Sequence, residues 1–155
     1  MKKNVFSLLI VITLGISCDK HKLYEEFQPV DGQKWNYEDI KHFNINIADS
    51  SAAYQTFICI RNSAKYAYSN LFLFVTVHSP LENTVRDTIE ITLADERGKW
   101  LGKGAANLYT IYNPLNIKFT TPGIYIIDIE HAMWVKDLEN IHDVGIRIEK
   151  PREKQ

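Results

Sequence analysis

The sequence predicts an all-β fold, a single antiparallel β-sandwich of the jelly-roll kind with one short helix. Several segments alternate strictly between apolar and polar residues, which is typical of strands with one face in a core and the other in water. Turn-forming residues separate these segments at intervals of about 8–12 residues. Once the first 17 residues are set aside, the remaining chain has the length of one domain.

Residues 43–48 form the first clear strand, because Phe43, Ile45 and Ile47 fall on one face and two asparagines on the other. Residues 70–78 are apolar on both faces, so they predict a central strand. The other expected strands are at 54–62, 88–94, 115–119, 123–131 and 144–150. The short helix is expected around residues 131–141, with the sequence HAMWVKDLENI.

The first 17 residues are expected to be an export signal. Lys2 and Lys3 precede an apolar run of about a dozen residues, which is shorter than the roughly 20 of a membrane span and fits a secretory signal. Gly15 and Ser17 are small residues just before Cys18, and residues 14–18 resemble a relaxed bacterial lipobox. In that case Cys18 is lipidated and becomes the first residue of the mature protein. Cleavage after Ser17 by an ordinary signal peptidase is the alternative.

The composition is that of an ordinary globular domain, with 45% hydrophobic and 24% charged residues and a formal net charge of −1. This balance argues against nucleic-acid binding, which requires clustered Lys and Arg. The domain layout that we expect is a signal peptide (1–17), a lipidated N-terminus and tether (18–33), a β-sandwich domain (34–150) and a solvated tail (151–155).

The chain has two cysteines, Cys18 and Cys59. If Cys18 carries a lipid, Cys59 is alone in an apolar run, where a lone cysteine usually packs as a small hydrophobe. A disulfide between the two is the alternative. Only Arg61 is near Cys59 in sequence to lower its pKa, so a catalytic thiol is not expected.

No residue pattern compels an enzyme. None of the five histidines has a second His or Cys at the spacing of zinc ligands, so we expect no metal and no cofactor. Asp128 and Glu130 share one face of a strand, as a general acid and base could. The opposite face is apolar throughout, which favours a simple solvated strand face. A hydrolase would require these carboxylates beside a histidine in a pocket.

A surface glycan-binding lipoprotein is the alternative function. Binding of this kind would use a flat platform of exposed rings. The candidate stacking residues are Trp35, Trp100, Tyr109, Tyr112 and Trp134. Tyrosines in strands more often pack across strands at the edge of a core.

Four consecutive blocks resemble one known family. They are RNSAKYAYSNLFLFVTV, RDTIEITLADERGKWLGKG, TTPGIYIIDIEHAM and LENIHDVGIRIEK, which extend from about residue 61 to 150. Their order and spacing resemble the gliding motility-associated lipoprotein GldH family of Bacteroidota. Three residues depart from that family's pattern: His131, Trp134 and Ala105 stand where glutamine, a basic residue and glycine are expected.

The resemblance implies a non-catalytic lipoprotein of the cell envelope, anchored through acyl chains such as palmitate on Cys18. It implies a protein-interaction component of the gliding motility and type IX secretion machinery, with other envelope proteins as partners and no nucleic acid. We expect anchoring to the outer membrane rather than the inner. The resemblance carries over no catalytic residue.

Overall fold

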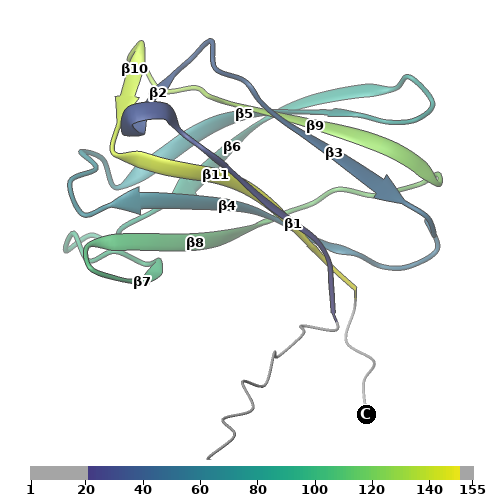
Figure 1. Ribbon diagram of the computed structural model, residues 1–155, viewed down its shortest axis with the longest axis horizontal. Coiled ribbons are helices and arrows are strands. Elements are labelled where there is room, and N and C mark those ends of the chain that lie inside the picture. Colours follow the sequence, from purple (N-terminus) through teal and green to yellow (C-terminus); the bar gives the residue numbers. More distant parts are fainter. Residues whose placement is uncertain (1–20, 151–155) are drawn as a thin grey trace, which may run out of the picture.

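The computed structural model describes residues 21–150, so the expected signal peptide, Cys18 and the tail lie outside the described residues. Antiparallel strands in two facing sheets make up this part of the chain (Figure 1). The strands are β1 (Lys22–Pro29), β2 (Lys34–Asn36), β3 (Lys41–Ile47), β4 (Gln55–Ser63), β5 (Asn70–His78), β6 (Thr84–Thr92), β7 (Lys103–Ala105), β8 (Leu108–Leu115), β9 (Gly123–His131), β10 (Asp137–Glu139) and β11 (Ile141–Glu149).

The strand order identifies the topology. One sheet, called here the front sheet, has the order β1-β11-β4-β8-β7, and the other, the back sheet, has the order β3-β9-β5-β6. The short strands β2 and β10 pair separately with each other. Apart from the β5–β6 hairpin, consecutive long strands alternate between the sheets, which is the arrangement of a jelly roll. The expected all-β sandwich is confirmed.

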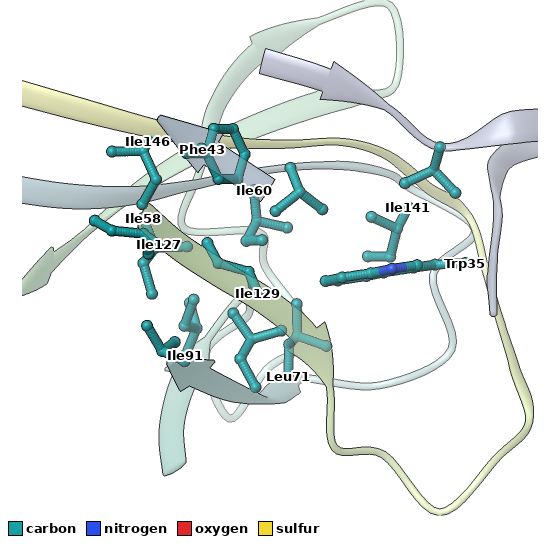
Figure 2. Close-up of a cluster of buried hydrophobic side chains, with 14 of the residues drawn as sticks. Trp35, Phe43, Ile58, Ile60, Leu71, Ile91, Ile127, Ile129, Ile141 and Ile146 are labelled. Carbon is teal, nitrogen blue, oxygen red and sulfur yellow. The ribbon is translucent and has the colours of Figure 1, made fainter. Parts of the chain in front are cut away.

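The core lies between the two sheets, and isoleucine is its commonest residue. Strand β3 shows why: its burial alternates residue by residue, with Phe43, Ile45 and Ile47 almost completely buried. The same alternation brings Ile127 and Ile129 of β9 into the cluster of Figure 2. Burying one such side chain contributes about 1.5–3 kcal/mol, so this cluster supplies most of the driving force for folding.

The expected tether over residues 18–33 is wrong from residue 22 onward. Lys22–Pro29 forms the edge strand β1, which is antiparallel to β11 in the front sheet. The pairing is close at Gly145, where a Cβ atom would lie 2.6 Å from the carbonyl oxygen of Glu26 and 2.9 Å from the Phe27 ring. The sequence of β1 is polar and lacks the apolar alternation that predicts a strand. An edge strand can form without it, because backbone pairing holds the strand and its charged side chains stay exposed.

The helix expected over residues 131–141 is also wrong. Strand β9 ends at His131, β10 pairs with β2, and Asn140 turns the chain into β11 with a φ of 68°. Leu138 and Ile141 have helical spacing, but each reaches the core from a strand. Within residues 21–150 the helical structure is a single 3₁₀ turn at Asp31–Gln33.

The strand expected at 115–119 is displaced toward the N-terminus. Strand β8 ends at Leu115, and the chain beyond it is irregular. Phe119 is nevertheless buried and Ile117 packs against the core. The apolar alternation therefore marked residues that enter the core from a loop.

The sandwich has two ends, which differ in the loops and short strands that they carry. At the terminal end the first and last described residues meet, because the N–H of Lys150 donates to the carbonyl of His21 at 2.8 Å. The loops 48–54, 79–83 and 116–122 lie at this end (Figure 1). The opposite end, called the far end, carries β2, β10 and the loops 64–69, 93–102 and 132–136.

Candidate functional site

The five aromatic residues proposed for glycan stacking do not form one platform. Trp35 is fully buried: its Nε1 donates to the carbonyl of Asp39 at 2.8 Å, and its ring meets His131 edge to face with centroids 5.5 Å apart. Figure 2 places it within the core beside Ile141. Its assignment as a stacking residue is therefore wrong, because a short strand inside a polar stretch of sequence carries the ring inward.

Trp100 and Tyr109 stack on each other at the far end. Their ring centroids are 5.8 Å apart with an interplanar angle of 29°, and both side chains are half-buried. Trp100 is held by a bridge to Ala94 and by a tilted contact with Tyr66. One face of each ring is therefore covered by the other ring, which fits a packing role at the edge of the core.

Tyr112 lies on the outer face of the front sheet, where it borders a shallow hollow of about 310 Å³ with Phe57, Arg147 and Glu149. Arg147 donates to Glu25 at 2.9 Å and to Glu149 at 2.6 Å. Burial alone would raise the pKa of Glu25, but hydrogen bonds from Arg147 and Lys22 hold it below its usual value. The rings of Phe57 and Tyr112 thus lie beside a cluster in which Arg147 and Lys22 balance the charges of two glutamates.

Cys59 is on the same outer face, where neighbouring side chains cover it completely. Its register partners are Gly145 on one side and Tyr112 on the other, and the side chain is completely buried. Burial raises the pKa of the Cys59 thiol to about 12, and Glu25 adds to that effect. Cys59 is a free thiol in the structure, as a buried hydrophobe would be, and the state of Cys18 lies outside the described residues.

A polar network crosses the outer face of the back sheet. Asp128 accepts from both neighbours, with Oδ1 2.7 Å from Nδ1 of His42 and Oδ2 3.1 Å from Nε2 of His78. The other ring nitrogen of His78 is 3.1 Å from Oγ1 of Thr84. The four side chains line an open hollow of about 470 Å³ together with Ser79.

This network contains the carboxylate–histidine contact that the hydrolase hypothesis requires. The order Asp128, His78, Thr84 also places a hydroxyl at the end of the chain of contacts. The Ser79 hydroxyl, in the same hollow, makes no hydrogen bond within residues 21–150, so no imidazole activates it. The histidines are open to solvent in this hollow, with the side chain of His42 59% and that of His78 39% exposed. Cross-strand polar pairing explains the geometry without catalysis.

The second carboxylate of this face, Glu130, is separately engaged. Arg86 contacts it at 2.6 Å, donates to Thr76 at 3.2 Å and lies over the Phe74 ring at 4.4 Å. Asp128 and Glu130 do share one face, as the alternation predicts. Asp128 pairs with imidazoles from the neighbouring strands β3 and β5, whereas Glu130 pairs with a guanidinium from β6 that reaches across β5. Within residues 21–150, no group of His, Cys, Asp and Glu side chains is arranged to hold a metal ion.

Trp134 is fully exposed, at 104% of its reference area, on the loop between β9 and β10 at the far end. The residues beside it are fixed, because Met133 and Val135 pack against the core and the Met133 sulfur accepts from the backbone N–H of Phe72 at 3.4 Å. The adjacent segment is tied to the same loop through a hydrogen bond from Tyr37 N–H to the Lys136 carbonyl at 3.0 Å. The fold thus presents an indole on a supported loop.

Two more exposed apolar side chains lie on the segment that hydrogen-bonds to the Trp134 loop. Tyr37 is 44% and Ile40 38% exposed. We call Tyr37, Ile40 and Trp134 the far-end patch. Sequence reasoning singled out Trp134 alone, because the backbone contact between residues 37 and 136 has no local signal.

The outer faces also show what local pattern reasoning missed. His42 and His78 come from different strands, and their contact with Asp128 depends on the register of β3, β9 and β5. The available signal was that all three residues occupy outward positions of alternating strands. The structure places no helix within residues 21–150 that has the length and hydrophobicity for crossing a membrane.

Taken together, the strand order and these surfaces define the chain as a jelly-roll β-sandwich domain with separate polar faces and an exposed aromatic end. The family described as GldH lipoprotein matches residues 22–148. The chain belongs to this family, which is one of lipoproteins associated with gliding motility.

Named relatives agree with this assignment. A gliding motility lipoprotein GldH homolog of Christiangramia forsetii is 35% identical, covering 95% of this chain and 95% of its own. The gliding motility lipoprotein GldH of Flavobacterium johnsoniae is 32% identical, covering 96% of this chain and 97% of its own. Among solved structures, a carbohydrate-binding module specific for non-crystalline cellulose aligns over 84% of this chain and 73% of its own at 11% identity, with a TM-score of 0.45. A likeness this weak carries no functional argument.

Proposed function

We propose that this protein is a non-catalytic, lipid-anchored component of the gliding motility machinery and its associated type IX secretion apparatus, and that its far end docks a protein partner. The observation that carries the proposal is the complete exposure of Trp134 on a supported loop. Tryptophan and tyrosine are the residues most enriched at interface hot spots. A rigidly presented indole also loses little conformational freedom on binding.

The rest of the far-end patch supports the same role. Tyr37 and Ile40 add exposed apolar surface beside the Trp134 loop. Exposed apolar residues that gather in one place mark interaction sites more often than scattered ones do. A protein partner from the cell envelope fits the motility association of the named relatives.

The anchor in this proposal is the lipid on Cys18. Several acyl chains hold a protein durably at a membrane, because each buried CH₂ contributes about 0.8 kcal/mol and one chain alone is marginal. We place the anchor in the outer membrane, with the signal peptide over residues 1–17 removed. The order of events is export, lipidation and then docking of the far end.

Site-specific photo-crosslinking in intact cells of the native host tests the docking. A photoreactive amino acid is placed at position 134, and the matched control carries it at Thr88, an exposed position on β6 away from the far end. We expect an adduct with a specific envelope protein from position 134 and none from position 88. Equal or absent adducts at both positions, with the protein at the membrane, would contradict the proposal.

Glycan binding is the alternative, and the hollow beside Tyr112 and Phe57 is the observation that favours it. A glycan array probed with the purified protein, with Tyr112→Ala and with Trp134→Ala separates the two functions. Binding that disappears only in Tyr112→Ala would replace docking by sugar recognition. No binding by any of the three proteins leaves protein docking as the function.

A further inference from the structure

The terminal end of the sandwich must lie close to the anchor. Cys18 is three residues ahead of His21, the first described residue, and three residues span at most about 11 Å when fully extended. The His21 carbonyl is held in place by the Lys150 N–H at 2.8 Å, next to the start of β1. A lipid on Cys18 therefore leaves the folded domain almost no room to stand away from the bilayer.

The same end exposes large apolar side chains. Leu81 at the tip of the β5–β6 hairpin is 63% exposed, Val85 at the start of β6 is 65% exposed, and Ile124 at the start of β9 is 61% exposed. These are among the most exposed aliphatic residues of the described chain. Leu81 belongs to the 79–83 loop of the terminal end, and Val85 and Ile124 each follow the first residue of a strand that begins at this end. We call them the terminal-end patch.

Packing holds this patch in shape. Pro80, beside Leu81, lies against Gly123, where a Cβ atom would come within 2.8 Å of the proline ring and where φ is +139°. Gly123 is followed directly by Ile124, so the hairpin tip and the start of β9 are held together. The terminal-end patch is thus a feature of the folded domain.

A hollow at the same end enlarges the apolar surface. It has a volume of about 360 Å³ between the β5–β6 hairpin and the 116–122 loop. Val77, Val85, Ile117 and Tyr125 contribute its apolar lining, and Asn83, Asn116 and Lys118 contribute polar groups. Apolar side chains bordered by polar ones suit the boundary between acyl chains and headgroups, where interfacial segments bury one face.

We propose that the terminal-end patch inserts into the lipid surface to which Cys18 is anchored, so that the domain stands on the membrane with its far end pointing away. This inference rests on the lipidation of Cys18 and deepens the proposed function, because it fixes which end remains free for a partner. The terminal-end patch would contact the bilayer itself, because only three residues separate a lipidated Cys18 from the folded domain.

The native tryptophans make the orientation measurable. Trp35 on β2, Trp100 in the 93–102 loop and Trp134 in the 132–136 loop all belong to far-end elements, so none is expected to approach the acyl chains. The experiment uses the full lipidated protein in vesicles of phosphatidylcholine, either with brominated acyl chains, which quench nearby indole fluorescence, or without bromine. The variant Leu81→Trp places a new indole in the terminal-end patch, and Leu101→Trp is the matched control, at a far-end position that is 50% exposed.

We expect bromine to quench the emission added by Leu81→Trp and to leave the native protein and Leu101→Trp unchanged. Ile124→Trp provides a second probe on a different element, and the same quenching is expected there. Unquenched emission from both patch variants, or equal quenching of Leu101→Trp, would overturn the proposed orientation.

Mass spectrometry of the mature N-terminal peptide is read on the same samples. A lipidated Cys18 together with unquenched patch variants would refute the orientation and leave the anchored, docking protein intact. An unmodified Cys18 would refute the anchor of the proposed function, and with it the orientation. The two failures therefore give different results.

Discussion

His131 is the buried residue that most clearly departs from usual chemistry. It is 2% exposed, and within residues 21–150 neither of its ring nitrogens makes a well-formed hydrogen bond. Burial lowers the pKa of His131, and the backbone of Trp35 and Lys136 opposes that shift only in part. The fold therefore favours the neutral form of this imidazole, which packs edge-on against Trp35.

Acidification should destabilise the fold through this residue. An unfolded histidine takes up a proton below a pKa of about 6.5, and the folded state resists that proton, so the free energy of unfolding falls as the pH drops below that value. We expect His131→Gln to lose less stability than the wild type between pH 7.5 and 5.5. Urea unfolding at both pH values measures this, and equal losses would contradict it.

Cys59 gives a second prediction at this scale. Because thiolate is the reactive form, a thiol with a pKa of about 12 that is also fully buried should not react with an aromatic disulfide reagent at pH 8. We expect no modification of the native protein and one modified thiol per chain in 6 M guanidinium when Cys18 is lipidated or replaced by serine. Fast labelling of the folded chain would show that the front sheet opens at Cys59.

Among the elements, β1 depends on a single small residue of its neighbour. Gly145 on β11 admits the Glu26 carbonyl and the Phe27 ring at distances that no side chain would allow. The Arg61 guanidinium lies over the same ring at 4.8 Å, which holds β1 on the sheet from above. The edge of the front sheet is therefore sensitive to a change on the strand beside it.

We expect Gly145→Ala to destabilise the protein by about 1–3 kcal/mol, the usual cost of overpacking, and to speed amide hydrogen exchange in β1 first. Thr88→Ala on the exposed edge of the back sheet is the control, with an expected change within about 0.5 kcal/mol. Chemical unfolding and exchange mass spectrometry measure both variants. A Gly145→Ala protein as stable as the control would contradict the close packing.

How far the sequence predicted the structure also depends on the element. Strands buried on one face, such as β3 and β9, follow from alternation, because the core imposes a period of two on their side chains. Strands β1 and β10 could not be predicted in this way, since backbone pairing defines them and few of their side chains are buried. Trp35 was misplaced for the same reason, because β2 is three residues long.

The candidate surfaces follow the same division. Trp134 is visible in the sequence as an unusual residue, but its exposure depends on how Met133 and Val135 pack beside it. The sharing of Asp128 by His42 and His78 depends on strand register across three strands, which no local pattern encodes.

At the scale of the whole molecule, membrane attachment and partner binding should separate cleanly. We expect Cys18→Ser to move the exported protein from the membrane fraction to the soluble fraction, with its unfolding transition unchanged. Cell fractionation and thermal unfolding measure the two properties. A Cys18→Ser protein that stays fully at the membrane would contradict attachment through a lipid.

Trp134→Ala should do the reverse. The Trp134 side chain is fully exposed, so its removal should change the free energy of unfolding by less than about 0.5 kcal/mol. Binding should weaken by about 2 kcal/mol or more if the indole is a hot spot, which is roughly thirtyfold in affinity. Co-purification from cells with the protein still at the membrane measures the loss.

The hydrogen bond between His21 and Lys150 has a practical consequence for experiments with this protein. Because the first and last described residues are adjacent, the domain is suited to circular permutation. A short linker could join these two residues while new termini are made at an exposed loop. A permuted chain opened in the 93–102 loop would carry its anchor at the opposite pole. Such a protein would present the wrong pole to its partner, while every contact within the sandwich stayed the same.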